Sequence, residues 1–351
     1  MSTGTATGRA RLRDRIDTAV QTLHPGYLAF VMATGIISTG TFLLGPSWLS
    51  QALLAVASAG LILLFAALTA RIVRFRSALV ADINAPDRVF GFFAIPAGLD
   101  VLGVRLALAG HPLLTAIAAG LAAAAWLVLT YGVPASLILF RAAESVLSCI
   151  DGSWLLWVVA TQSLALAAAT LSPAWPSQAA LLATAAVSLW SIGLVLYLVL
   201  VTLIVLRSLT VPMTPATLGP SYWILMGATA ITVLVGAKNL ALPGTLPVVR
   251  ATAGFVEGAS FALWAFGTWW IPLLVVLGLW RHVRRQWPIS YEPNLWSIPF
   301  PIGMYSVATL TLGMATHLDF TEPLARFMLW VAVAAWALVA AALGIHLAKD
   351  R

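Results

Sequence analysis

Charged side chains are scarce in this chain of 351 residues. Asp, Glu, Lys and Arg together make up 9% of the sequence, whereas a soluble domain carries about 25%. Hydrophobic residues account for 61%, which excludes an ordinary soluble globular protein. Apolar runs of about 18 residues or more recur along the whole chain, and each is long enough to cross a bilayer as a helix. We predict an all-α integral membrane protein.

Cysteine is almost absent, since Cys149 is the single one in the sequence. One cysteine excludes a disulfide framework and any metal site built from several thiolates. The histidines fall in loops or at helix ends, and the sequence has no HExxH, no aspartate-rich isoprenoid-phosphate motif and no reactive cysteine pair. We therefore expect no metal, no cofactor and no enzymatic activity.

Basic residues outnumber acidic ones, 19 to 12. They are spread over short loops rather than over one soluble face, so we expect no nucleic-acid partner. Most of them lie at the two chain ends and in the loops before residue 89 and after residue 280. The positive-inside rule then places both termini in the cytoplasm, in a multi-pass protein of the cell membrane. Residues 1–23 are read as a basic cytoplasmic leader and residues 348–351 as a short cytoplasmic tail.

Residues 24–347 are predicted to hold ten transmembrane helices that form five out-and-back hairpins. The second helix of most hairpins is a plain run of Ala, Leu and Val, whereas the first helix carries Gly, Pro and hydroxyl side chains. We expect the five odd-numbered helices to surround a central pore and the five even-numbered ones to cover them. The expected spans are 24–44, 51–72, 89–109, 112–140 with an interruption at Pro134, 153–171, 179–206, 219–238, 253–280, the region around 296–309, and 324–347.

The odd-numbered helices share a signal at their cytoplasmic starts, where Pro25, Pro86, Pro220 and Pro293 or the capping residue Asp151 occur. Helices that start at one mouth gather their positive dipole ends there, which favours anions. A cation channel would instead offer rings of acidic residues. The signals at the cytoplasmic starts of the odd-numbered helices therefore indicate an anion path, although prolines also begin some of the even-numbered helices.

The stretch from Trp296 to Thr309 carries two prolines, a glycine and three Ser or Thr side chains inside an apolar segment. Such a mixture is unnecessary for a simple lipid anchor, because backbone groups freed by proline must be satisfied by protein or water. We hypothesise that Phe300 plugs the pore as a hydrophobic gate, and that Pro299, Pro301 and Gly303 kink this helix as a hinge. The alternative is that Phe300 packs against neighbouring helices.

Small and hydroxylated residues of the odd-numbered helices are candidates for the pore lining, and close helix packing explains about half of them equally well. The candidates are Thr34, Gly35, Ser38, Pro96, Thr161, Gly227, Thr229 and Ser306.

Charged residues within the spans are few. Asp100 lies near the middle of the membrane and is either a proton site or part of a buried pair with Lys238 or Arg105. Lys238 and Arg105 are near the outer ends of their helices, from which their side chains could reach the interface. Glu257 is expected to cap the eighth helix.

Several motifs resemble the tellurite-resistance/dicarboxylate transporter family: His24-Pro25-Gly26-Tyr27, Met32-Ala33-Thr34-Gly35-Ile36, Phe93-Ala94-Ile95-Pro96-Ala97 and Trp296 to Pro301. This family includes the bacterial tellurite-resistance permease, the fungal malate permease and sulfite pump, and the plant slow anion channels. The resemblance implies five helical hairpins, one pore per subunit, a homotrimer and a pore-blocking phenylalanine at Phe300. Pro299 departs from the plant members, which have a small polar residue there.

We therefore expect an anion channel or permease that moves small inorganic anions across the cytoplasmic membrane. The alternative is a proton-coupled carrier of C4-dicarboxylates such as malate, or an exporter of sulfite or tellurite oxyanions, in which Asp100 would be the proton site.

Overall fold

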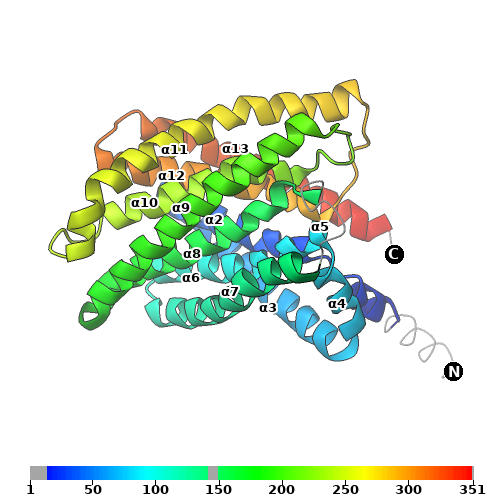
Figure 1. The fold of residues 1–351 in the computed structure, drawn as a ribbon, viewed down its shortest axis with the longest axis horizontal. Coiled ribbons are helices and arrows are strands. Elements are labelled where there is room, and N and C mark those ends of the chain that lie inside the picture. Colours follow the sequence, from blue (N-terminus) through cyan, green and yellow to red (C-terminus); the bar gives the residue numbers. More distant parts are fainter. Residues whose placement is uncertain (1–13, 141–148, 350–351) are drawn as a thin grey trace.

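The computed structural model describes residues 14–140 and 149–349. Every regular element in these residues is helical, and ten of the helical segments are long and apolar enough to cross a membrane. Figure 1 shows them as one bundle, with residues 14–21 and the end of α13 at the same end of it. The predicted all-α membrane fold with ten spans is confirmed.

The five odd-numbered spans share one design: a 3₁₀ turn leads into an α-helix, directly in four of them and after Ile298 in the ninth. These units are η1 (Pro25–Leu28) with α2 (Ala29–Leu44), η2 (Phe90–Phe93) with α6 (Ala94–Leu108), η4 (Gly152–Leu155) with α8 (Leu156–Leu171), η7 (Pro220–Trp223) with α10 (Ile224–Leu240), and η9 (Pro293–Ser297) with α12 (Pro299–Thr316). The even-numbered spans are longer: α3 (Ser47–Arg74), α7 (Pro112–Phe140), α9 (Ala179–Thr210), α11 (Pro247–Leu279) and α13 (Thr321–Lys349).

The bundle has an inner ring and an outer layer. We compared the most apolar 18 residues of each span. Between 72 and 89% of these residues are buried in the odd-numbered spans, against 11 to 39% in the even-numbered ones. The inner helices touch in the closed order α2, α6, α8, α10, α12 and back to α2. Each outer helix packs on its own hairpin partner and on the inner helix of the next hairpin. The predicted arrangement, with odd helices inside and even helices outside, is confirmed.

The five 3₁₀ turns form a second closed ring at the end of the bundle where the inner helices begin. Proline stands at the start of three of these turns, where a missing backbone N–H costs nothing. Asp151 caps the η4 turn by accepting a hydrogen bond from the Ser153 N–H at 3.0 Å. Gly152 lies so close to the Ser221 carbonyl of η7 that no side chain fits there. The five 3₁₀ turns, several of which begin at the predicted proline and Asp151 positions, therefore form a tightly packed ring that we call the collar.

Tryptophan side chains join the two layers. At four of the five junctions, an outer-helix indole N–H donates to the inner helix of the following hairpin, and the last junction closes the ring from α13 back to α2. The donor and acceptor pairs are Trp126 to the Thr161 hydroxyl at 2.9 Å, Trp190 to the Thr232 carbonyl at 2.9 Å, Trp264 to the Thr309 hydroxyl at 3.0 Å, and Trp336 to the Thr34 hydroxyl at 2.9 Å. A buried indole N–H needs such a partner. At the fifth junction Leu61 and Phe65 of α3 pack instead against an apolar cluster around Leu99.

Three local predictions were wrong. Pro134 lies inside α7 without interrupting it. The eighth span starts at Pro247, so Glu257 lies exposed on α11, well after the first turn, and cannot cap it. Pro299 stands at the first position of α12, so Pro299 and Pro301 begin a helix after the η9 turn rather than kinking a continuous one.

Two short helices that the sequence patterns did not reveal, α4 (Arg76–Ile83) and α5 (Pro86–Val89), lie between the first and second hairpins. Single turns η5 (Ser172–Ala174) and η6 (Pro176–Gln178) connect α8 to α9, and the π-helical turn η8 (Trp280–Arg284) extends α11.

Candidate functional site

Helical spacing assigns Phe300 to the face of α12 that is turned toward the axis of the inner ring. The other faces are occupied: Pro301 lies against α10, Gly303 against α2, Ser306 against α13, and Thr309 against α11. With 3.6 residues per turn, Phe300 falls opposite the outward-facing pair Ser306 and Thr309. Phe300 is 1% exposed, so the axis at its level is closed to water.

Further along α12, the same face carries Met304, Val307 and Thr311, spaced four, seven and eleven residues after Phe300. Met304 and Val307 are buried, whereas Thr311 near the other end of the helix is partly exposed. The closed part of the axis therefore lies nearer the collar of 3₁₀ turns, and the axis-facing side of α12 opens toward its far end.

Two glycines let the first turns of α12 fit tightly between α10 and α2. A Cβ added at Gly227 would lie 2.8 Å from the Pro301 Cγ, and one added at Gly303 would lie 3.0 Å from the Ile37 Cγ1. Gly35 likewise faces α6, where an added Cβ would meet the Val101 Cγ1 at 3.3 Å. The main role of these three glycines is to let neighbouring helices pack closely together.

Most of the predicted hydroxyl lining is turned away from the axis. The hydroxyls of Thr34 and Thr161 accept from outer-layer indoles, and the Ser306 hydroxyl donates to the Ala325 carbonyl of α13 at 2.7 Å. Thr229 packs against Gly267 of α11.

Ser38 completes this group, because it exchanges hydrogen bonds with Ser50 of α3 at 2.8 Å. All five hydroxyl candidates therefore take part in contacts between helices, and their place in a pore lining stays a prediction. Pro96, buried in the first turn of α6, stays a prediction.

Lys238 shares a face of α10 with Gly227, since eleven residues span about three full turns. Gly227 contacts the first turn of α12 beside the gate candidate, and Lys238 lies at the opposite end of α10, where it is partly exposed. None of the ion pairs formed by the described residues involves Lys238. The amino group therefore leaves a positive charge near the far end of the ring.

Asp100 lies at the contact between α6 and α8, where its Oδ2 accepts a hydrogen bond from the Ser163 hydroxyl at 3.0 Å. It is fully buried, and its Oδ1 has no hydrogen-bond partner in the part of the chain that the structure describes. The predicted pairing with Lys238 or Arg105 is wrong, because no ion pair among the described residues includes Asp100. A buried carboxyl group with one hydroxyl donor and no counter-charge is costly to hold in its charged form.

Arg105, in the last turn of α6, is turned into the bundle. Its guanidinium is buried and donates to the hydroxyls of Ser38 at 3.1 Å and Ser50 at 2.8 Å, which ties α6 to the first hairpin. The ring of Phe42 covers it, with the Cζ 4.4 Å from the ring centre. Arg105 is a packing and hydrogen-bonding residue between hairpins.

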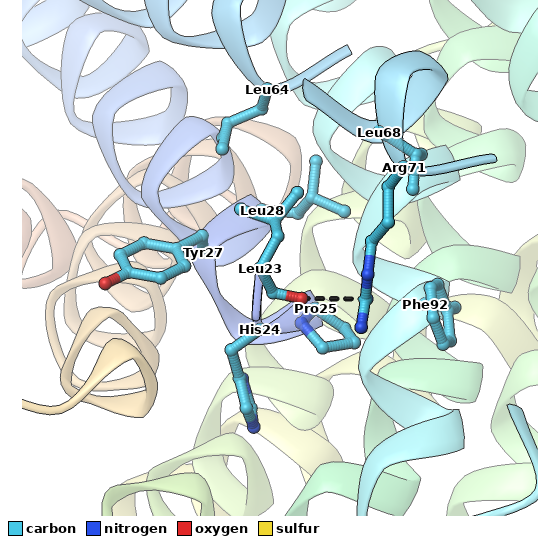
Figure 2. A pocket seen from close by; sticks show the side chains of 9 residues that line it. All are labelled: Leu23, His24, Pro25, Tyr27, Leu28, Leu64, Leu68, Arg71 and Phe92. Carbon is cyan, nitrogen blue, oxygen red and sulfur yellow. Dashed lines mark hydrogen bonds between the residues drawn. The ribbon is translucent and has the colours of Figure 1, made fainter. Parts of the chain in front are cut away.

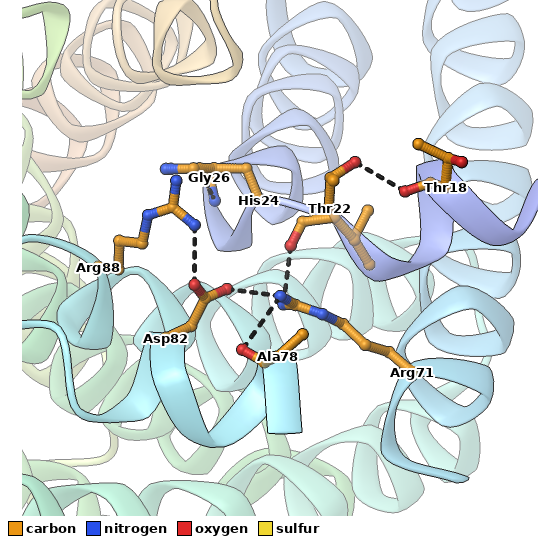
Figure 3. A network of polar contacts seen from close by, with 9 residues as sticks. Thr18, Thr22, His24, Gly26, Arg71, Ala78, Asp82 and Arg88 are labelled. Carbon is orange, nitrogen blue, oxygen red and sulfur yellow. Dashed lines mark hydrogen bonds and ion pairs between the residues drawn. The ribbon is translucent and has the colours of Figure 1, made fainter. Parts of the chain in front are cut away.

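A polar network fastens the first inner turn to the loop that contains α4 and α5 (Figure 3). Asp82 forms ion pairs with Arg71 and with Arg88, both at 2.8 Å, and Arg71 also donates to the Leu23 carbonyl at 2.9 Å. Arg71 and Asp82 are nearly inaccessible to water, so this pair is screened much less than a surface pair. The network holds the entry of η1 in place.

His24 caps the η1 turn beside this network. Its Nδ1 accepts a hydrogen bond from the Gly26 N–H at 3.0 Å. Figure 2 shows the imidazole, Pro25 and Arg71 around a cavity of about 10 Å³, enough for about one water molecule. Burial, followed by the charge of Arg88, lowers the pKa of His24 below its ordinary value. The described residues contain no cluster of three or more His, Cys, Asp or Glu side chains arranged to hold a metal ion.

The sequence is similar to known membrane proteins. Uncharacterized membrane proteins of Mycobacterium tuberculosis strains CDC 1551 / Oshkosh and H37Rv are each 46% identical over 153 residues, which cover 44% of this chain and 77% of theirs. The profile of the SLAC1 family, described as voltage-dependent anion channels, matches residues 22–343. This match agrees with the resemblance drawn from the motifs and with the ten-span fold. The chain therefore belongs to the SLAC1 family of voltage-dependent anion channels.

Proposed function

We propose that this protein conducts small inorganic anions along the axis of its inner ring, and that the Phe300 side chain is the gate. The observation that carries this proposal is the position of Phe300, buried on the axis-facing side of α12 while every other side of that helix contacts a neighbour. An aromatic ring that fills a narrow apolar passage excludes water, and an ion cannot cross without its hydration shell. Movement of the ring would open the route.

The charge distribution supports an anion as the conducted species. Five helices begin at the collar, so their positive dipole ends face the same mouth. Lys238 adds a positive charge toward the other end of the ring. The described part of the inner ring contains a single buried carboxylate residue, Asp100, and no ring of acidic groups. These features favour chloride-like or nitrate-like ions over cations.

We also propose the orientation and assembly. The described ends of the chain lie at the collar end. Basic residues mark the ends of the outer helices that return there: Arg71 and Arg74 in the last turn of α3 and Arg281 in η8, with Arg88 in α5. The positive-inside rule then places both termini and the collar in the cytoplasm and the protein in the cytoplasmic membrane. A homotrimer with one pore per subunit follows from the resemblance to slow anion channels and dicarboxylate transporters.

Anion flux into vesicles tests the gate. Full-length protein is reconstituted at equal density, and chloride uptake is measured for the wild type, Phe300→Ala and the matched variant Phe327→Ala. Phe327 lies on α13 and is 64% exposed, so its loss removes a ring of the same size outside the ring of inner helices. We expect faster uptake for Phe300→Ala alone. Equal uptake by all three proteins, at equal folded yield, would refute the gate.

A second candidate function is a proton-coupled carrier of C4-dicarboxylates or of sulfite or tellurite oxyanions. It is favoured by Asp100, whose carboxyl group, among the described residues, has one hydroxyl donor, one unbonded oxygen and no cationic partner. A carboxyl group in this setting can take up and release a proton as the anion passes.

The two functions differ in their dependence on a proton gradient. A carrier shows saturable uptake that follows an imposed pH gradient, and Asp100→Asn abolishes this dependence while leaving the protein folded. A channel shows unitary currents, and Asp100→Asn leaves the driving force unchanged. Ser163→Ala removes the hydroxyl that donates to Asp100 and that also lies 2.9 Å from the Ala160 carbonyl, and it serves as the graded control.

A further inference from the structure

A groove of about 550 Å³ lies at the collar end of the molecule, where α11 ends. Its walls are the last turns of α11 around Leu274 and Gly278, the η7 turn around Trp223, and the chain segment 287–298. Its volume is in the range of a small-ligand site. The outer side of α11 is apolar and exposed along this stretch, so the groove faces the lipid at the level of the cytoplasmic headgroups in the proposed orientation.

The walls of the groove are apolar and its rim is basic. Arg281 and His282 line it and Arg284 and Arg285 follow directly, whereas Glu292 is the single acidic residue in the lining. Arg281 and Arg285 lie over the rings of Trp287 and Trp280, with 5.8 and 5.1 Å between the guanidinium carbon and the ring centre. Trp beside Arg is typical of the membrane–water interface.

Two observations indicate that the groove has an occupant. Arg281 is 7% exposed, yet its Nε has no hydrogen-bond partner among the described residues, and its ion pair with Glu292 is long at 3.4 Å. Ile289 in the lining is 86% exposed. A buried cationic donor without a full set of partners and an uncovered apolar side chain lie in the same groove. A ligand with an anionic head and an apolar tail satisfies both.

We propose that this groove binds one anionic phospholipid of the cytoplasmic leaflet. The phosphate lies at the basic rim, within reach of Arg281, and an acyl chain follows the apolar wall past Gly278 and Leu274. A lipid fits better than a free anion because most of the lining is apolar. An anionic headgroup fits better than a zwitterionic one because the basic rim carries several cations against one carboxylate.

The bound lipid also braces the gate helix, and this part of the inference rests on the proposed function. Leu295 and Ile298 line the groove, and Ile298 immediately precedes Pro299 at the start of α12, two residues before Phe300. Trp223 of the neighbouring η7 turn lines it as well. Filling the groove therefore restrains the two turns that flank the entry of the gate helix.

Native mass spectrometry of the purified full-length protein tests binding independently of transport. Protein is mixed with phosphatidylglycerol or phosphatidylcholine, and retained lipid is counted. Gly278→Leu fills the groove, and a Cβ at this position meets no atom within 4 Å. Gly258→Leu on the same helix is the matched control, because its Cβ also meets nothing. Arg284→Gln with Arg285→Gln lowers the rim charge without touching the buried Arg281.

We expect the wild type and Gly258→Leu to retain one phosphatidylglycerol per chain with about tenfold preference over phosphatidylcholine. Gly278→Leu should lose it, and the double arginine variant should lose most of the preference. Equal retention of both lipids, or unchanged retention in Gly278→Leu, would overturn the proposal. Displacement of the lipid by inorganic phosphate at equal concentration would also overturn it, because it would indicate a simple anion site. A change of subunit number in Gly278→Leu would overturn it as well, because it would indicate an interface between copies.

Failure of the anion-path proposal leaves this result intact, because lipid retention is measured without flux. If lipid binds, chloride flux of the wild type in vesicles with and without phosphatidylglycerol reports whether it braces the gate. If phosphatidylglycerol changes the chloride flux of the wild type but not that of Gly278→Leu, lipid binding is coupled to the gate. Equal flux with and without the lipid in both proteins refutes this coupling.

Discussion

Pro301 of α12 and Gly227 of α10 are packed so closely that a Cβ at position 227 would lie 2.8 Å from the Pro301 Cγ. No ordinary carbon–carbon contact is this short, and the proline ring cannot rotate away. The first turn of α12 is therefore fixed against α10 by the absence of a side chain. In the proposed gate, this contact and the one between Gly303 and α2 would hold Phe300 on the axis.

We expect Gly227→Ala to push the first turn of α12 out of place. Forcing an extra methyl group into a packed contact costs about 1–3 kcal/mol, so the thermal midpoint in detergent should fall and the gate should leak chloride. Gly132→Ala on α7 is the control, because a Cβ there meets nothing within 4 Å. If Gly227→Ala has the thermal midpoint and the chloride flux of the wild type, the contact between α10 and α12 adjusts to the added methyl group without loss of stability or closure.

The hydrogen bond from Trp336 to Thr34 closes the ring between the last and first hairpins, and we expect Thr34→Val to weaken that closure. The variant leaves the indole N–H without its acceptor, and hydrogen bonds between membrane helices contribute on average about 0.6 kcal/mol. A double-mutant cycle with Trp336→Phe, measured by unfolding in mixed micelles, isolates the pair. Thr202→Val is the control, since that hydroxyl bonds only to its own helix at the Leu198 carbonyl. A coupling energy of zero would mean that packing alone closes the ring.

Removing the charge of Lys238 should slow anion passage. A unit charge a few ångströms from a passing ion in water contributes about 1 kcal/mol, so Lys238→Gln should lower chloride flux by about fivefold and Lys238→Arg should restore it. The effect should shrink at high salt. Lys349→Gln at the opposite end of the molecule is the control. If the flux changes neither with the residue at position 238 nor with the salt concentration, Lys238 does not lie on the anion path.

The His24 cap predicts a pH dependence of stability. Burial and Arg88, then Arg71, disfavour the imidazolium, whereas Asp82 and Asp87 favour it, and the net effect lowers the pKa of His24 below 6.5. The unfolded chain therefore takes up a proton at a higher pH than the folded one, so this contribution is complete above about pH 6.5 and is lost as the pH falls below it.

Thermal midpoints of the wild type should thus fall more steeply from pH 7.5 to 5.5 than those of His24→Asn. Asparagine keeps a side-chain oxygen at the cap and removes the titrating group. Parallel curves for the two proteins would assign the pH dependence to other residues.

The sequence predicted the spans, the two layers and the proline-marked helix starts, because hydropathy and N-terminal signals are local properties of the chain. It could not predict which way the small polar residues face. Thr34 and Thr161 are turned to outer-layer indoles, and Ser306 to α13, because a hydroxyl suits a helix contact as well as a wet lining.

A signal for these contacts was present. Four even-numbered spans carry a tryptophan whose partner lies in the next odd-numbered span, namely Trp126, Trp190, Trp264 and Trp336. The groove at the end of α11 had no sequence signal, because its walls come from segments that meet only in the folded bundle.

Planar-bilayer recording across a size series at position 300 tests the central claim most directly. Unitary conductance in chloride and nitrate is compared for Phe, Leu, Val and Ala at this position, with Phe327→Ala as the control. We predict that conductance rises as the side chain shrinks, by about tenfold or more for Ala, which corresponds to about 1.4 kcal/mol removed from the barrier, with reversal potentials that follow the anion gradient. Conductance that stays the same across the series in folded protein, or that follows the cation gradient, would contradict the account.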